Sequence, residues 1–198
     1  TTLADKGYFP KEELKKLRQL GCILQGHPDM KRTPGVDIST GSLGLGLSVG
    51  IGMSLAAQLD KQDYYTYVLL GDGELQEGQN WEAAMSAAKF KLDHLIAIVD
   101  NNGVQLDGTL EEIMPMGDIG RKFEAFGWNV LHVDGHDVRA VDAAIDQAKM
   151  ARGKPSVIIA KTVKGKGVSF MEGKNSWHGK AIEDSDYAIA MAELGGAK

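Results

Sequence analysis

The chain has 198 residues, of which 43% are hydrophobic and 25% are charged, and its formal net charge at pH 7 is −5. This length and composition suit one globular domain with its own core. The negative charge argues against a nucleic-acid-binding protein, whose binding face is basic. The single cysteine, Cys22, is expected to be a buried hydrophobe that forms no internal disulfide, and no signal-peptide pattern opens the chain. We therefore expect a cytoplasmic protein.

The first predicted element is an amphipathic helix over residues 11–20, with Leu14 and Leu17 facing inward. Residues 38–59 follow without any charge, and small residues recur there at every fourth position. This pattern would also suit a membrane helix. We favour a buried helix, because the polar, turn-like residues 39–42 leave too few apolar residues for a span. So many glycines indicate that another backbone or a ligand comes very close.

The remaining chain alternates between predicted strands and helices. Four apolar runs are expected to be buried strands, at residues 67–70, 95–99, 129–133 and 156–160. A further helix is expected over residues 119–126. The helix after Glu77 and the helix capped by Asp137 are each predicted to place four side chains in the core: Trp81, Ala84, Met85 and Ala88 in the first, and Val138, Val141, Ile145 and Ala148 in the second. This alternation predicts an α/β fold with a largely parallel sheet and helices on both faces.

The most informative motif is Gly71-Asp72-Gly73, followed thirty positions after Asp72 by Asn102. Each half follows a predicted strand, and a strand, a crossover helix and a parallel strand take roughly thirty residues. The spacing therefore places a carboxylate and a carboxamide together at the carboxyl ends of two strands, where open α/β sheets bind ligands. Mg²⁺ prefers oxygen ligands and is commonly completed by phosphate oxygens. Each half alone is an ordinary turn sequence, but the pair predicts a site for a metal and a diphosphate.

Further motifs accompany this pair along the chain. They are Thr40-Gly41-Ser42-Leu43-Gly44, Gly71-Asp72-Gly73-Glu74-Leu75-Gln76-Glu77-Gly78, Asp100-Asn101-Asn102-Gly103, Lys164-Gly165-Lys166-Gly167 and Trp177-His178-Gly179-Lys180. Together they resemble the transketolase family, and within it the amino-terminal subunit of the split form found in bacteria and archaea. The resemblance covers nearly the whole chain and implies a single diphosphate-binding domain of thiamine diphosphate enzymes over residues 1–198. It also implies that the domain is truncated at its amino terminus, where the family carries further active-site histidines.

The resemblance assigns a metal and cofactor site. It implies that Asp72, Asn102 and the backbone carbonyl of Val104 hold Mg²⁺, with Ca²⁺ or Mn²⁺ as possible substitutes. It also implies that Gly73 packs its backbone against the diphosphate. The residues implied to bind the cofactor are Gly41, Leu43, Gly71, Asp72, Gly73, Glu74, Asn102 and His178.

The resemblance also assigns three residues to catalysis. It implies that His27 contacts the donor sugar and that His178 lies near the diphosphate and the substrate hydroxyls; a histidine suits such work because it titrates near neutral pH. Glu77 is implied to contact the activating glutamate of a partner domain, and Gly41 and Leu43 to lie against the pyrimidine and thiazolium rings. The other histidines are predicted to be structural: His94, His132 and His136.

The implied activity is the transfer of a two-carbon ketol unit from a ketose phosphate to an aldose phosphate, as in the pentose phosphate pathway, with thiamine diphosphate as cofactor. In the family, a pyrimidine-binding domain supplies the glutamate that activates the cofactor. That domain is not in this sequence, so the resemblance implies a homodimer or heterotetramer that includes a partner subunit. No nucleic-acid or membrane partner is expected.

Three alternatives remain open on the sequence. The α subunit of a 2-oxo acid dehydrogenase shares the Gly-Asp-Gly and Asn-Asn signature but not the motifs at residues 75–78 and 177–180. A deoxyxylulose phosphate synthase is disfavoured in the same way. From a different class, the chain could be a non-catalytic cofactor-binding or assembly module. An assay of ketol transfer with a pyrimidine-domain partner would separate such a module from an enzyme subunit.

Overall fold

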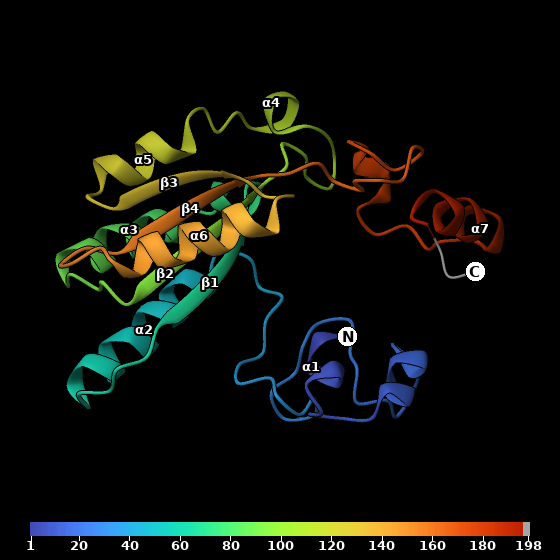
Figure 1. The fold of residues 1–198 in the computed structure, drawn as a ribbon, viewed down its shortest axis with the longest axis horizontal. Coiled ribbons are helices and arrows are strands. Elements are labelled where there is room, and N and C mark those ends of the chain that lie inside the picture. Colours follow the sequence, from blue (N-terminus) through green and yellow to red (C-terminus); the bar gives the residue numbers. More distant parts are fainter. Residues whose placement is uncertain (196–198) are drawn as a thin grey trace. The chain divides into compact units, whose positions relative to one another are not determined.

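The computed structural model describes residues 1–195, which divide into two compact units (Figure 1). The first unit is Thr1–Leu43, and the second begins at Gly44. The prediction of a single domain over residues 1–198 stays a prediction.

The first unit contains little regular structure. It holds the short helix α1 (Thr2–Asp5) and the 3₁₀ helix η1 (Lys11–Lys16). The helix predicted over residues 11–20 is therefore wrong in type and length. The chain turns extended at Leu17, and Arg18 takes a left-handed conformation with φ of 63°, which ends the helix and leaves the Leu17 side chain exposed. Cys22 is buried, as expected.

The second unit is built on a four-stranded sheet. Its strands are β1 (Thr66–Gly71), β2 (Leu95–Asn101), β3 (Asn129–Asp134) and β4 (Ser156–Lys161), in the spatial order β1-β2-β4-β3. Every pair is parallel. All four predicted strands are present, and the α/β fold with a parallel sheet is confirmed.

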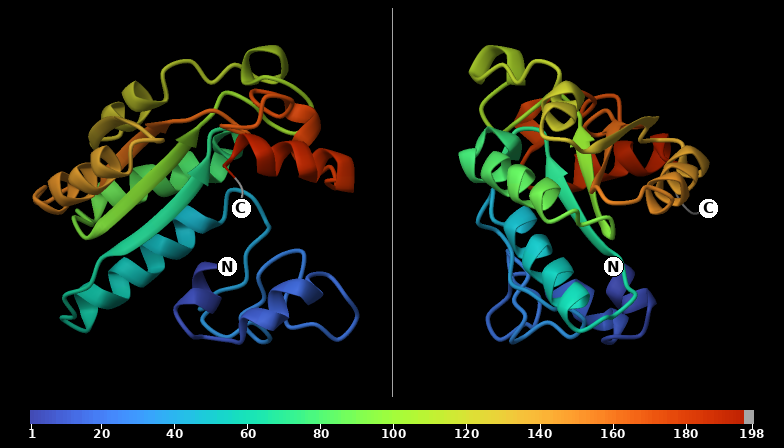
Figure 2. Two further views of the ribbon diagram at one scale, coloured as in Figure 1. Left: turned by 45° about the vertical axis from the view of Figure 1, so that its right-hand side comes forward. Right: turned by 90° about the vertical axis from the view of Figure 1, so that its left-hand side faces the viewer.

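Helices cover both faces of this sheet (Figure 2). On one face α2 (Gly46–Leu59), α3 (Gly78–Lys89) and α5 (Ile119–Ala125) contribute to the larger core, which contains the fully buried Leu70, Leu95 and Phe123. On the other face α6 (Val138–Lys149) packs alone, around Ile96 and Ile158. Four short helical elements complete the unit: η2 (Glu74–Gln76), α4 (Leu110–Ile113), η3 (Asn175–Trp177) and α7 (Asp184–Glu193).

Some predicted core positions are exposed. Met85 on α3 and Val138 on α6 face solvent, while Ala83, Ala87 and Ala144 are buried. Ala84 and Ala148 are buried as predicted, and Trp81, Ala88 and Ile145 pack against the two cores. Only part of each predicted stripe is therefore displaced, toward alanines that pack on the sheet. Strand β1 is also not fully buried: Leu69 is 74% exposed, because α6 packs on β3, β4 and β2 and leaves the edge strand uncovered.

The uncharged segment over residues 38–59 is helical only from Gly46 onward. Within the described residues, no helix is long and apolar enough to cross a membrane. At Gly50 the close neighbour is a side chain and not the backbone or ligand that was predicted: an added Cβ atom would lie 2.5 Å from Cγ2 of Val68 on β1. At Gly52, in the same helix, an added Cβ atom would meet nothing within 4 Å.

This contrast gives a matched test of helix packing. We expect Gly50→Ala to lower the free energy of unfolding by about 1–3 kcal/mol, because the methyl group overpacks the contact with Val68. Gly52→Ala should instead raise it by up to about 1 kcal/mol, because alanine is the better helix former. Urea unfolding followed by circular dichroism measures both changes. Equal effects of the two substitutions would contradict the packing of α2 on β1.

Candidate functional site

The candidate site is centred on Asp72, which joins the loops after β1 and β2. Gly71 pairs with Asp100 in the sheet register, so both loops begin at the same edge. Oδ1 of Asp72 accepts the N–H of Gly73 at 2.8 Å, and Oδ2 accepts the N–H of Gly103 at 2.5 Å. The two halves of the motif, thirty residues apart, therefore meet at the carboxyl ends of adjacent strands.

The environment of Asp72 favours a nearby cation. The residue is only 1% exposed, and burial raises the pKa of its carboxyl group above the ordinary value, while the N–H groups of Gly103 and Gly73 lower it. The charge of Asp100 adds to the rise. A buried carboxylate is costly unless it is paired or coordinates a metal, so a divalent cation beside Asp72 would stabilise its ionised form.

The neighbouring loop offers further oxygen atoms. Oδ1 of Asn102 accepts the N–H of Val104 at 2.9 Å, and Val104 is buried in a bridge with Thr109. Carboxylate and amide oxygens have lone pairs beyond those used in these bonds. The available donors are therefore hard oxygens, which fit Mg²⁺. Residues 1–195 contain no cluster of three His, Cys, Asp or Glu side chains that could hold a metal, so a cation at Asp72 would need phosphate or water oxygens.

Gly73 lies close to Gln105 of the loop after β2. An added Cβ atom would be 3.0 Å from the Cβ atom of Gln105, so a larger residue would push the loops apart. The amide of Gln76 donates to the side-chain oxygen of Gln105 at 2.6 Å and to the carbonyl of Met114. This amide pair joins the loops a second time, beside Asp72.

Two glutamates flank the loop after β1. The carboxylate of Glu74 accepts the N–H groups of Gly44 and Gly71 at 2.9 and 3.1 Å. Glu77 occupies the N-cap position of α3, where its side chain makes no capping hydrogen bond and is exposed. The exposed side chain of Glu77 therefore lies at the same edge of the sheet. Its backbone is close to Gly44, because a Cβ atom added at Gly44 would be 2.6 Å from the Cβ atom of Glu77.

His178 follows η3 in the glycine-rich segment near the carboxyl terminus. Its side chain is exposed, and its N–H donates to the carbonyl of Asn175 at 2.8 Å. The amide of Asn175 in turn donates to the carbonyl of Leu106 at 3.2 Å. This contact connects the segment that carries His178 to the loop that carries Asn102. The sequence held no signal for this connection or for the Gln76–Gln105 pair.

The first unit brings together His27 and Gly41. Gly41 has a φ of 120°, and an added Cβ atom there would be 2.7 Å from the His27 ring. A side chain at position 41 would therefore displace the histidine. His27 and Leu43 are both exposed, so their side chains are accessible to a ligand.

The remaining histidines have contacts that fit structural roles. His94 stacks on Tyr65, with ring centroids 4.4 Å apart. Nε2 of His136 accepts the N–H of Val163 at 2.8 Å. His132 lies against Gly120 of α5.

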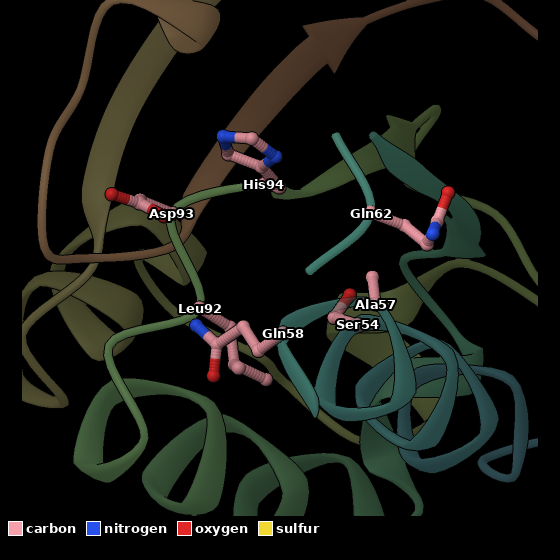
Figure 3. A pocket seen from close by; sticks show the side chains of 7 residues that line it. All are labelled: Ser54, Ala57, Gln58, Gln62, Leu92, Asp93 and His94. Carbon is pink, nitrogen blue, oxygen red and sulfur yellow. The ribbon is translucent and has the colours of Figure 1, made fainter. Parts of the chain in front are cut away.

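A small pocket lies at the other end of the strands (Figure 3). Its lining includes His94, directly before β2, whereas Asp72 directly follows β1. The full lining is Ser54, Ala57, Gln58, Gln62, Leu92, Asp93 and His94. Because the two strands are parallel, this pocket is separate from the loops around Asp72.

The comparisons with known proteins agree with this geometry. Residues 4–197 match the family described as "Transketolase, thiamine diphosphate binding domain". The chain is 49% identical over 192 residues to the 6-deoxy-6-sulfo-D-fructose transketolase subunit SqwG of Clostridium sp. (strain MSTE9), with 97% of this chain and 70% of the relative covered. It is 44% identical over 193 residues to an apulose-4-phosphate transketolase subunit of Phocaeicola vulgatus, with 98% and 68% covered.

A solved structure shows the same fold. The transketolase from Campylobacter jejuni superposes with a TM-score of 0.88 at 36% identity, covering 93% of this chain and 30% of the longer protein. The fold and the family match thus define a thiamine diphosphate-binding domain. The chain belongs to the transketolase family, as its motifs predicted, and it spans about 30% of the length of that solved transketolase.

Asp72 provides the direct test of this site. We expect Asp72→Ala to abolish metal-dependent binding of thiamine diphosphate, because Asp72 and Asn102 supply too few ligands for the loss of one to be tolerated. Titration calorimetry with and without Mg²⁺ measures the effect. Asp142→Ala, which removes an exposed carboxylate from α6, should bind as the unmodified chain does. Unchanged affinity in Asp72→Ala would refute the assignment.

Proposed function

We propose that this chain is the thiamine diphosphate-binding subunit of a transketolase that moves a two-carbon ketol unit from a ketose phosphate to an aldose phosphate. The observation that carries the proposal is the meeting of Asp72 with the loop over residues 102–104. A hydrogen bond from the N–H of Gly103 to the carboxylate of Asp72 joins the two loops. The family match covers residues 4–197.

In this proposal the chain holds the diphosphate end of the cofactor. Asp72, Asn102 and the carbonyl of Val104 hold Mg²⁺, for which Ca²⁺ or Mn²⁺ can substitute, and the glycines of the motif let the backbone approach the diphosphate. When bound, the cofactor supplies the carbanion chemistry that cleaves and forms the carbon–carbon bond. The protein supplies binding, orientation and proton transfer.

Two histidines act on the sugar. His27 contacts the donor near its reacting carbons, and the absence of a side chain at Gly41 leaves room for the imidazole ring. His178 lies near the diphosphate and the substrate hydroxyls, on a segment anchored through Asn175 to the metal loop. Both side chains are exposed, so a bound sugar can reach an imidazole that gives or takes a proton.

The active enzyme needs a second subunit. The relatives from Clostridium and Phocaeicola are named as transketolase subunits. A pyrimidine-binding partner supplies the activating glutamate, and Glu77, which is exposed at the sheet edge, contacts it. Exposed apolar side chains at Leu59, Tyr67 and Leu69 favour assembly as a homodimer or heterotetramer.

The substrate is a sugar phosphate or a close analogue. The relatives are named for 6-deoxy-6-sulfo-D-fructose and for apulose-4-phosphate, so an acidic group at the end of the sugar is common to both names. A cytoplasmic location and a place in the pentose phosphate pathway belong to this proposal, with other sugar pathways as the alternative.

His178 tests the catalytic half of the proposal. In the assembled enzyme, His178→Ala should lower turnover at least about tenfold, somewhat less than a positioned acid or base commonly contributes. His132→Ala serves as the control, because His132 contacts α5 and not the loops around Asp72. Steady-state assays of ketol transfer measure turnover, and thermal melting checks folding. If His178→Ala has the same turnover and the same thermal stability as the unmodified enzyme, this histidine is structural.

Assembly gives a separate test. We expect the chain to self-associate at micromolar concentration, because obligate interfaces are large and apolar, commonly above about 2,000 Å², and such chains often lack a stable monomer. Ketol transfer should appear only after a pyrimidine-domain subunit is added. Sedimentation and a sugar-transfer assay measure the two properties. A well-behaved monomer, or full activity without a partner, would contradict the proposal, while cofactor binding without transfer in the mixture would indicate a non-catalytic module.

A further inference from the structure

Glu74 connects two separate parts of the second unit through its side chain. One carboxylate oxygen accepts the N–H of Gly44 at 2.9 Å, and the other accepts the N–H of Gly71 at 3.1 Å. Gly44 lies thirty positions before Glu74, near the start of α2, whereas Gly71 is the last residue of β1. One side chain therefore fixes the entry to α2 against the end of β1.

The backbone of Glu74 is itself held in place. Asn80 on α3 is fully buried, and its Nδ2 donates to the carbonyl of Glu74 at 2.8 Å. Oδ1 of Asn80 has no hydrogen-bond partner within the described part of the chain. The polar interaction that this buried amide makes is therefore the bond to Glu74, which anchors η2 to α3.

Gly44 is constrained from a second side. Its φ is 84°, and an added Cβ atom would lie 2.6 Å from the Cβ atom of Glu77. Only glycine adopts this conformation freely and fits this space. The backbone of Gly44 is thus held by two contacts, the hydrogen bond to Glu74 and the close packing against Glu77.

We propose that Glu74 is a positioning residue that acts through the backbone and does not touch the cofactor. It holds Gly44, and with it the entry to α2, in register with the turn from Gly71 into Asp72. A free carboxylate beside a diphosphate would repel it. The two N–H groups engage both oxygens of Glu74, and this contact replaces the direct cofactor contact that the family resemblance implies. The inference rests on the proposed function.

The two acceptor bonds require a carboxylate of this length. Glutamine has one acceptor oxygen and a donor amide, so Glu74→Gln keeps one bond and turns an N–H donor toward another N–H. Aspartate is one methylene shorter and can reach at most one of the two backbone groups. Both variants should therefore release Gly44 or Gly71.

The experiment reads the contact directly in the cofactor-free chain. We expect residue-resolved hydrogen exchange by NMR to be at least about tenfold faster at Gly44 or Gly71 in Glu74→Gln, as for a locally opened hydrogen bond. Exchange at Ile98 in the central strand β2, which reports overall stability, should be unchanged. Titration calorimetry with thiamine diphosphate and Mg²⁺ should show an affinity about tenfold lower. Glu82→Gln, the same substitution at an exposed position of α3, should match the unmodified chain in every measurement.

The outcomes separate the possible failures. Unchanged exchange at both glycines would overturn the contact itself, and faster exchange with unchanged affinity would overturn the positioning role. If Glu74→Gln does not fold, Glu74→Asp is measured in the same way, with the same expected direction. If the unmodified chain does not bind thiamine diphosphate, the proposed function fails, whereas exchange at Gly44 and Gly71 still decides whether Glu74 holds the two segments together.

Discussion

The interaction on which the rest of the site depends is the acceptance of two backbone N–H groups by the buried carboxylate of Asp72. Burial disfavours the ionised form, and the N–H groups of Gly73 and Gly103 favour it. A carboxylate so placed holds the two loops at a fixed separation before any ligand arrives. It also keeps unused lone pairs at the sheet edge, so the structural contact and metal coordination can coexist.

The loops around Asp72 are held mainly by polar bonds between side chains and backbone. Gln76 binds Gln105, Glu74 binds two glycine amides, and Asn175 reaches the carbonyl of Leu106. Apolar packing would fill the space that a diphosphate needs, whereas hydrogen bonds fix glycine-rich backbone and leave that space open. The apolar core also extends into these loops at Leu75, Leu110 and Met116, and glycines occupy positions between them. The site is therefore preorganised by contacts that the reacting groups never make.

The sequence predicted the features that depend on local pattern and strand spacing. The four strands and the meeting of Asp72 with the loop of Asn102 followed from apolar runs and a thirty-residue crossover. The predictions for residues 11–20, Met85 and Val138 failed, because helical periodicity does not show where a left-handed residue ends a helix or which stripe of an alanine-rich helix packs on the sheet. The exposure of β1 and the contacts of Glu74 depend on long-range packing, which local pattern does not encode.

The number of donors at Asp72 has a thermodynamic consequence. At the proposed metal site, Asp72, Asn102 and the carbonyl of Val104 would offer about three oxygens to a cation that takes six, so the remaining positions would fall to phosphate and water. Diphosphate oxygens would then be ligands of the metal. By linkage, each of the two would raise the affinity of the chain for the other by the same factor. Such a site would favour the metal and the diphosphate together over either alone.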